Sequence, residues 1–513
     1  MDIEQQAAKG VKWTAIATLC KAILQLLLLS LAARYYLSAA EFGLYAIVQV
    51  VLGFAQLFMD MGLGNAIIHH QQVKQRHIAE LFFINLVIAL LLASCVFLTA
   101  PWIALFFDSQ GVEPFLLYIA PSFVIAALFR MHLVMLQKQL AFNVIAKVEI
   151  FSHCIGFAVA LVCLYLGFNL SALIFGYLAN LVFQGMCYWY FSPYQLKCKF
   201  PRSYQELKPY CAFGVFQTAD ATVNYFNSQF DVILVGKLLG AEILGGYALA
   251  RQFCFRPAMV INPVLTRVAF PLMAKLQHSK ELSALYCQLS GVLALINFPL
   301  YIALAVFAEP IVYLVFGERW HSIIEIFQLM AIWCLVRSTM NPVGSLLMAV
   351  GKVKQLFQWN FSLLFIMPLT IMVSSQYGVL GIVWALLILQ CILFVLHRLI
   401  LLKSLAHIEL ALFNRRLAVP FVITLVSMGI TYLITNAFIF SGLISSGIFS
   451  PELETSNVAT TAKTTFQLTI FSYANSLYIV GISMVSFVSL YLMSSFYFNP
   501  LFKNVIKGKL LTK

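Results

Sequence analysis

Apolar stretches long enough to cross a bilayer, separated by short polar connections, follow one another along this 513-residue chain. A helix of about 20 apolar residues spans a hydrocarbon core of ~30 Å, and inside lipid a helix satisfies its own backbone hydrogen bonds. The pattern predicts an all-α polytopic membrane protein with about 14 transmembrane helices. The predicted spans are 12–36, 42–68, 79–106, 114–137, 148–167, 170–191, 209–236, 241–273, 288–308, 323–350, 356–375, 379–402, 417–440 and 467–495.

Connections that are rich in lysine and arginine alternate along the chain with connections that contain few of them. With a cytoplasmic N-terminus, the inner connections and tails hold 22 of the 32 cationic residues, the outer connections hold four, and six lie within spans. Cytoplasmic loops of membrane proteins carry such an excess. The bias predicts that both termini are cytoplasmic, and it accounts for the net charge of +13 without a nucleic-acid partner.

Two short segments of the chain repeat each other. Residues 37–46 (LSAAEFGLYA) are similar to residues 239–248 (LGAEILGGYA), and aligning Gly43 with Gly245 gives an offset of 202 positions. Both copies start at an outer connection and run inward, as in transporters built from parallel repeats. The repeat predicts two six-helix lobes, 1–200 and 201–405, followed in 406–513 by two additional helices and a cytoplasmic C-terminal tail.

Composition narrows the possible chemistry. Charged residues make up 10% of the chain and hydrophobic residues 62%, whereas soluble domains contain about 25% charged residues. The 11 cysteines include no Cys-x-x-Cys pair, so neither a disulfide framework nor a metal site is indicated. No P-loop motif occurs, so ATP hydrolysis is not indicated. We expect a membrane protein that is not an enzyme and carries no cofactor.

Polar side chains are concentrated in two adjacent spans between residues 213 and 275. Four of them recur at positions i, i+4, i+7 and i+11 and so share one face of a helix: Asp220, Asn224, Asn227 and Asp231. The following span carries Arg251 and Arg256. Ionisable groups are costly inside a membrane and commonly mark a substrate path. We therefore expect these two spans to line such a path.

Several short motifs occur together between residues 5 and 405. They are KGVKW (9–13), EFGLYA (41–46), DMGLGNA (60–66), LQKQLAF (136–142), DVILVGKLLG (231–240), YALA (247–250), RVAFP (267–271) and AVGK (349–352). In combination they resemble the polysaccharide flippases of the colanic-acid and teichuronic-acid exporter type. The resemblance implies the MATE-like fold of the MOP superfamily and an undecaprenyl-pyrophosphate-linked oligosaccharide as substrate. Beyond residue 405, including the Ser/Thr-rich connection 441–465, no family motif is present.

Cations within the spans are the candidates for binding such a substrate. Arginine holds phosphate oxygens by bidentate, charge-assisted hydrogen bonds. The neutral residues Gln49 and Asn262 are added to these cations, because the 202-residue offset pairs Gln49 with Arg251 and Asn262 with Asp60. The candidate substrate-binding residues are Lys21, Gln49, Arg130, Arg251, Arg256, Asn262 and Arg337. The alternative for each cation is a structural ion pair or an interfacial position reached by snorkelling.

Carboxylates within the spans are the candidates for coupling transport to a cation gradient. An aspartate in the membrane can bind a proton or Na⁺, so the sequence allows coupling to H⁺ or Na⁺, with a substrate gradient as the alternative source of energy. The candidates are Asp60, Asp220 and Asp231. A structural acid in an ion pair is the alternative for each.

The spans, the repeat and the resemblance predict a flippase of the bacterial cytoplasmic membrane. It would move lipid-linked oligosaccharide repeat units outward by alternating access, for synthesis of O-antigen, capsule or exopolysaccharide. Expected partners are the lipid-linked substrate, the bilayer, and a polysaccharide polymerase with its chain-length machinery. One alternative is a cation-coupled multidrug antiporter of the same fold, whose cavity should be acidic and aromatic. Another is a membrane polysaccharide polymerase or ligase, which needs a substantial outer loop for its chemistry.

Overall fold

The structure is a computed structural model that describes residues 3–60, 64, 67, 73, 75–192, 200, 204–279, 281–340, 342–440, 481, 483–497 and 499. Within these residues the regular secondary structure is helical and includes no strand. Eleven helical stretches of this part of the chain are long and apolar enough to cross a membrane. The predicted all-α polytopic fold is confirmed.

Packing divides the chain into two compact units. Unit 1 comprises Met1–Val260, Val315–Ile326 and Lys354–Leu386, and unit 2 comprises Ile261–Leu314, Phe327–Val353 and Leu387–Lys513. The lobe boundaries expected after residues 200 and 405 stay predictions.

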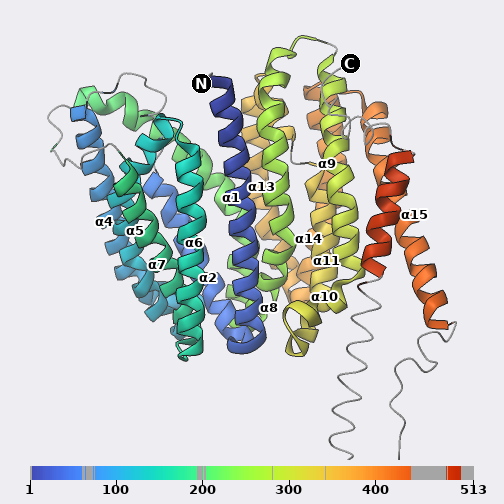
Figure 1. Ribbon diagram of the computed structural model, residues 1–513, viewed down its shortest axis with the longest axis horizontal. Coiled ribbons are helices and arrows are strands. Elements are labelled where there is room, and N and C mark those ends of the chain that lie inside the picture. Colours follow the sequence, from blue (N-terminus) through green and yellow to red (C-terminus); the bar gives the residue numbers. More distant parts are fainter. Residues whose placement is uncertain are drawn as a thin grey trace, which may run out of the picture. The chain divides into compact units, whose positions relative to one another are not determined.

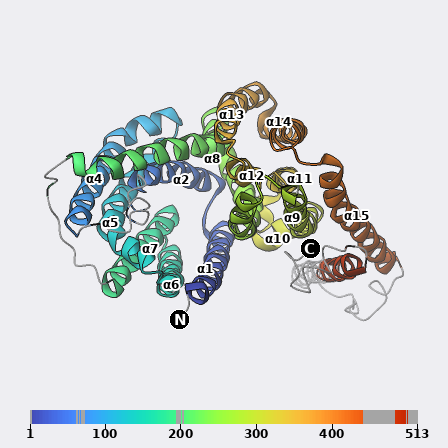
Figure 2. The ribbon, with the colours of Figure 1, turned by 90° about the horizontal axis from the view of Figure 1, so that it is seen from above.

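Unit 1 begins with six long helices, which Figure 1 shows along their length and Figure 2 from above. They are α1 (Ile3–Leu31), α2 (Ala39–Asp60), α4 (Gln75–Phe106), α5 (Glu113–Lys138), α6 (Phe142–Tyr165) and α7 (Asn169–Phe191). Helix α6 packs along α1 and α7, and α5 packs along α4 and α7. A π-helical turn, Ala32–Tyr36, follows α1, and a 3₁₀ turn, Gln110–Val112, precedes α5.

The outward side of α4 shows why these helices suit a membrane. Leu91, Leu98, Trp102 and Leu105 lie at helical spacing along it, and each is 65–73% exposed. A soluble protein rarely leaves so long an apolar stripe uncovered. In a bilayer, by contrast, lipid tails cover it.

Helix α2 begins at a capping box. The Glu41 carboxylate accepts a hydrogen bond from the backbone N–H of Ser38 at 2.8 Å, and the Ser38 hydroxyl accepts one from the backbone N–H of Glu41 at 3.3 Å. Such reciprocal bonds satisfy backbone donors that have no partner within the helix. The start of α2, which is also the first copy of the repeat, is thereby fixed.

Helix α8 (Tyr204–Lys275) is a hairpin of two arms. Gly240, with φ 83° and ψ 171°, interrupts it, and such a backbone conformation favours glycine. Arg251 and Asp231 are 20 residues apart, about 30 Å along a straight helix, yet they form an ion pair. The chain therefore reverses at Gly240, which separates a first arm (204–239) from a second arm (241–275), as two predicted spans require.

The two repeat copies cross each other at glycines. A β-carbon added to Gly43 would collide with the carbonyl group of Ala241, and one added to Gly245 would collide with the carbonyl group of Ala39. The offset of 202 relates 39 to 241 and 43 to 245, so the two contacts are equivalent. A reciprocal contact of this kind is what a twofold relation between repeat copies produces. We call it the glycine crossing.

A second long apolar stretch, Val353–Leu405, also contains two predicted spans. Its helices α13 (Val353–Ser374) and α14 (Gly378–Leu396) are separated by a 3₁₀ turn, Ser375–Tyr377, and α14 begins at Gly378, whose φ is 71°. With this stretch and α8 each counted twice, the eleven stretches provide thirteen crossings. The shorter apolar helix Ser483–Tyr497 overlaps the second half of the fourteenth predicted span and ends two residues beyond it.

Unit 2 is built around the pairing of two long helices. After α8 it contains α9 (Glu281–Val306), most of α10 (Ala308–Val315) and of α11 (Ile324–Ser338), α12 (Val343–Ala349), residues 387–396 of α14, the π-helical segment His397–Leu405 and α15 (Leu410–Phe440). Helix α9 packs along α15, where the rings of Tyr286 and Phe413 stack at 6.1 Å between centroids. The Tyr491 hydroxyl donates a 2.6 Å hydrogen bond to the carbonyl of Leu295, which joins the helix around residue 490 to α9.

Candidate binding cavity

Helices α1, α2 and both arms of α8 surround a cavity of about 260 Å³ within unit 1. Its polar lining consists of Gln25, Gln49, Tyr225, Gln229, Arg251, Gln252 and Arg256. Its apolar lining consists of Ala46, Val50, Gly53, Val232, Ala248, Phe255 and Met259. We call this space the repeat cavity, because the residues after both repeat motifs contribute to it.

The glycine crossing and one tyrosine fix the walls of the repeat cavity. Gln49 follows Gly43 by six residues on α2, and Arg251 follows Gly245 by six residues on the second arm, so the two side chains lie at equivalent positions. Tyr225 of the first arm donates a 2.6 Å hydrogen bond to the carbonyl of Val50. Its ring packs on Gly53, where a β-carbon would lie 2.7 Å from the hydroxyl oxygen.

Arg251 is bound on several sides. Its Nε lies 2.5 Å from Oδ2 of Asp231, and both residues are buried. The Tyr247 hydroxyl donates to the same carboxylate oxygen at 2.8 Å, and Nη2 of Arg251 donates to the carbonyl of Ser228. The guanidinium also lies over the Phe255 ring, 4.6 Å from its centroid. Asp231 therefore neutralises Arg251 and fixes its orientation.

Arg256 differs from Arg251 in its surroundings. Among the described residues, no hydrogen bond or ion pair to its guanidinium is present. The Tyr45 hydroxyl is close enough to both Arg256 and Gln49 to interact with them. Because Asp231 compensates Arg251, the lining of the repeat cavity carries one guanidinium charge without a carboxylate partner in the described part of the chain.

Arg130 lies in a second cavity of unit 1, with a volume of about 220 Å³, between α5 and α7. Its other polar lining residues are Gln56, Ser122, Tyr177, Gln184 and Tyr188. The Gln56 amide donates to the Tyr177 hydroxyl at 3.1 Å. Arg130 therefore lines a different cavity from Arg251 and Arg256, although all three were predicted to bind substrate.

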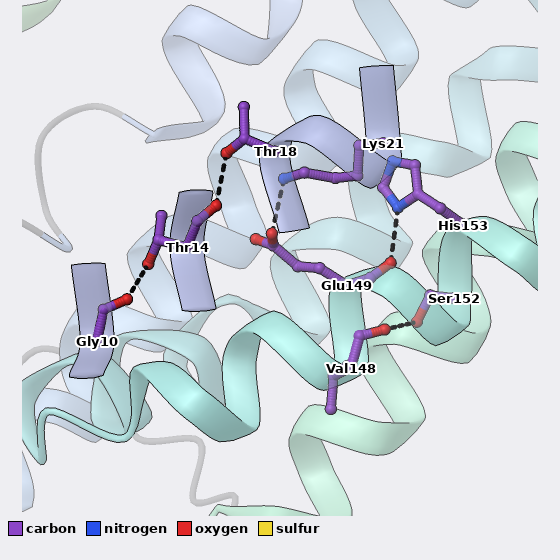
Figure 3. Close-up of polar contacts among 8 residues, drawn as sticks. All are labelled: Gly10, Thr14, Thr18, Lys21, Val148, Glu149, Ser152 and His153. Carbon is purple, nitrogen blue, oxygen red and sulfur yellow. Dashed lines mark hydrogen bonds and ion pairs between the residues drawn. The ribbon is translucent and has the colours of Figure 1, made fainter. Parts of the chain in front are cut away.

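Lys21 is held by a carboxylate of another helix. Its Nζ lies 2.6 Å from Oε2 of Glu149 on α6, as Figure 3 shows. The backbone carbonyl of Glu149 lies 2.9 Å from Nδ1 of His153. Lys21 lines neither of the two cavities. We did not predict the contribution of Glu149, which is detectable in the sequence only as a lone acid at the start of an apolar span.

Two other predicted binding residues lie in unit 2. The Arg337 guanidinium lies over the Trp333 ring at 4.9 Å. Asn262 is buried, and its Oδ1 accepts a 3.0 Å hydrogen bond from Nδ2 of Asn297 on α9. Neither residue lines the repeat cavity. Their roles in substrate binding stay predictions, as does that of Lys21.

The candidates for cation coupling are described only in part. The side chains of Asp60 and Asp220 lie outside the described part of the structure. Asp231 forms an ion pair with Arg251. A structural ion pair is the alternative to a coupling role that the sequence analysis gave for each aspartate. The predicted coupling role of the three aspartates stays a prediction.

Comparison with known proteins gives consistent matches. Residues 32–325 match the model of a family described as polysaccharide biosynthesis protein. The teichuronic acid biosynthesis protein TuaB of Bacillus subtilis (strain 168) is 32% identical over 430 residues, 83% of this chain and 88% of that protein. The lipopolysaccharide biosynthesis protein WzxC of Escherichia coli (strain K12) is 30% identical over 434 residues, 84% of this chain and 88% of that protein.

Solved structures share the fold at low sequence identity. The lipid II flippase MurJ in an inward closed conformation aligns with a TM-score of 0.68 and 13% identity, over 96% of this chain and 99% of that chain. An inward-facing multidrug resistance transporter of the MATE family, in the MOP superfamily, aligns with a TM-score of 0.59 and 14% identity, over 76% and 99%. The predicted MATE-like fold is confirmed.

Proposed function

Because the chain belongs to the family of polysaccharide biosynthesis proteins, we propose that it is a flippase for a lipid-linked oligosaccharide. In this proposal the phosphate groups of the substrate bind Arg256 in the repeat cavity, and the protein moves them across the membrane without a covalent step. The names of the relatives, which are biosynthesis proteins for teichuronic acid and lipopolysaccharide, support a polysaccharide precursor as substrate.

The observation that carries the proposal is the charge of the repeat cavity. Arg251 is compensated by Asp231, whereas Arg256 has no carboxylate partner among the described residues. A lone guanidinium inside a membrane protein is costly and is best stabilised by an anion. Phosphate suits it because the planar guanidinium can bind two phosphate oxygens at once. A cavity for cationic drugs would need the opposite charge.

The proposal also includes the location of the protein in the membrane and the source of energy for transport. We place the protein in the bacterial cytoplasmic membrane with both termini on the cytoplasmic side, on the basis of the 22-to-4 distribution of Lys and Arg. A gradient of the substrate or of H⁺ or Na⁺ would supply the drive, with Asp60, Asp220 and Asp231 as the carboxylates available for a coupling ion. A polysaccharide polymerase and chain-length proteins would receive the exported units.

Complementation of a bacterium that lacks its own flippase tests the proposal. Wild type and Arg256→Met are compared at matched expression, and surface polysaccharide is measured. We expect Arg256→Met to lower export about tenfold or more, because a hydrogen bond to a charged group contributes about 1.5–3 kcal/mol. The control is Arg398→Met, since Arg398 packs on Phe394 and binds Asn414 and does not line the cavity.

Two results would contradict the proposal. One is equal export by wild type and Arg256→Met. The other is a wild type that restores no polysaccharide in hosts with different repeat units but confers resistance to cationic dyes, which would favour the multidrug antiporter of the same fold.

A further inference from the structure

The repeat cavity is lined by four glutamines, which the charge-based argument above does not use. Gln25 comes from α1, Gln49 from α2, Gln229 from the first arm of α8 and Gln252 from the second arm. Each of the four walls around the cavity, namely α1, α2 and the two arms of α8, thus contributes one amide. Four unrelated positions that converge on one space indicate a common task.

Most of these amides make no side-chain hydrogen bond to another residue in the described part of the chain. Within the described residues, the side chains of Gln25, Gln229 and Gln252 make no hydrogen bond to another residue, and Gln49 lies beside the Tyr45 hydroxyl. Glutamines that support a fold look different: Gln56 donates to Tyr177, and Gln390 donates to Sδ of Met340. These three side chains are partly exposed in the cavity, so their donors and acceptors are available to a ligand that enters it.

The chemistry of an amide defines the ligand that it fits. Each glutamine offers two N–H donors and a carbonyl acceptor without a charge. A hydroxyl group also donates and accepts, so a ring of hydroxyls matches a ring of amides. The phosphate of the substrate does not need these amides, because Arg256 supplies the positive charge that binds it. The four amides therefore suit a neutral, polyhydroxylated group.

The repeat copies contribute different chemistry to the cavity. The offset of 202 relates Gln49 of α2 to Arg251 of the second arm, and Phe54 to Arg256. Both guanidinium groups thus belong to the second copy, and the equivalent positions of the first copy are uncharged. The positive charge of the cavity therefore comes from the second copy, whereas both copies contribute amides: Gln25 and Gln49 from the first, and Gln229 and Gln252 from the second.

The volume of the cavity suits one part of such a ligand. About 260 Å³ accommodates a group on the scale of one sugar ring with a phosphate. We propose that Gln25, Gln49, Gln229 and Gln252 form a sugar subsite that hydrogen-bonds the hydroxyls of the ring next to the phosphate held by Arg256. This inference rests on the proposed function and adds the residues that bind the neutral part of the substrate.

Binding of prenyl pyrophosphates with and without a sugar tests the subsite. The full-length protein is reconstituted in lipid nanodiscs and titrated with geranylgeranyl pyrophosphate and with the same lipid carrying glucose, galactose or N-acetylglucosamine. For wild type, we expect at least one sugar to increase affinity over the sugar-free lipid. Equal affinity for all four probes would overturn the inference.

Replacing single amides assigns the effect to its residues. Gln25→Met, Gln229→Met and Gln252→Met keep the length of the side chain and remove its hydrogen bonds. Each should weaken binding of the preferred glycosylated probe about fivefold, which corresponds to about 1 kcal/mol, the usual net contribution of a neutral hydrogen bond. Binding of the sugar-free lipid should change less than twofold. Gln390→Met, which removes an amide outside the cavity, should change neither.

The pattern across variants separates this inference from the proposed function. If the Gln→Met variants weaken both kinds of probe equally, or neither, the amides do not bind sugar, and the sugar subsite is wrong. Arg256→Met should weaken binding of every probe, because all carry the pyrophosphate. If Arg256→Met leaves all four affinities unchanged, the proposed phosphate site is wrong, whatever the glutamine variants show.

Discussion

At the scale of single residues, the two arginines of the repeat cavity show how similar sequence signals acquire different roles. Arg251 and Arg256 are five residues apart on one arm, and the sequence predicted the same role for both. The structure gives Arg251 a carboxylate, a carbonyl and a ring as partners, and leaves Arg256 without a carboxylate among the described residues. The chain reverses at Gly240, and this reversal places Asp231 beside Arg251 and not beside Arg256.

The ion pair of Asp231 and Arg251 leads to a prediction about stability. Asp231→Asn should destabilise the protein by about 3–5 kcal/mol, because it leaves a buried guanidinium without its counter-charge. A lower apparent melting temperature in detergent, followed by thermal unfolding, would show the loss.

The matched control for this prediction removes both charges. The double variant Asp231→Asn/Arg251→Gln should recover part of the stability, since no charge is then left unpaired. If the double variant is less stable than Asp231→Asn alone, the unpaired charge of Arg251 is not what destabilises Asp231→Asn, and the assigned role of Asp231 is wrong.

Residue roles were predictable from the sequence only where charge marks them. Arginines inside apolar spans are conspicuous, and Arg251 and Arg256 do line one cavity with Gln49. Gln25, Gln229 and Gln252 were missed because a neutral amide is common in a sequence and gains meaning only when other amides surround the same space. Glu149 was missed as the partner of Lys21 because 128 residues separate them.

At the scale of elements, the glycine crossing determines how α2 and the second arm of α8 approach. The backbone of each glycine lies against a carbonyl group of the other copy, so neither position has room for a side chain. The sequence contained this information as the similarity of residues 37–46 and 239–248. It could not show that the two copies touch each other, because similarity alone does not specify contact.

Alanine at the crossing should be more harmful than alanine elsewhere. Gly43→Ala or Gly245→Ala should destabilise the protein by about 1–3 kcal/mol or more, since overpacking forces the backbone to move. Gly429→Ala is the control, because nothing lies within 4 Å of an added β-carbon there and alanine is the better helix former by about 1 kcal/mol. Thermal unfolding of the three variants is the measurement, and equal melting temperatures would refute close packing at the crossing.

At the scale of the whole molecule, the fold was the most predictable property. The thickness of a bilayer sets the length of each span, so hydropathy alone gave the helices, including both halves of the α8 hairpin. The division of the chain into packing units was not predictable in the same way. Segments 315–326 and 354–386 join unit 1 from distant parts of the sequence, and no local pattern shows which helices will pack together.

The orientation in the membrane follows from the charge of the connections and can be tested directly. An alkaline phosphatase fused after residue 455, in the connection 441–465, should be active, because that enzyme folds outside the cytoplasm. A fusion after residue 405 should be inactive, since the connection there lies among cytoplasmic Arg and Lys residues. The reverse pattern of activities would invert the proposed topology.

The glycine crossing also has a consequence for how this protein can change over generations. A side chain that collides with another side chain can be accommodated by trimming the neighbour, so two substitutions can compensate each other. At Gly43 and Gly245 the neighbour is a backbone carbonyl, which no substitution at Ala241 or Ala39 removes. If one of these glycines is replaced during evolution, no side-chain substitution across the contact can therefore compensate for it. Reversion to glycine is the direct way to restore the close packing.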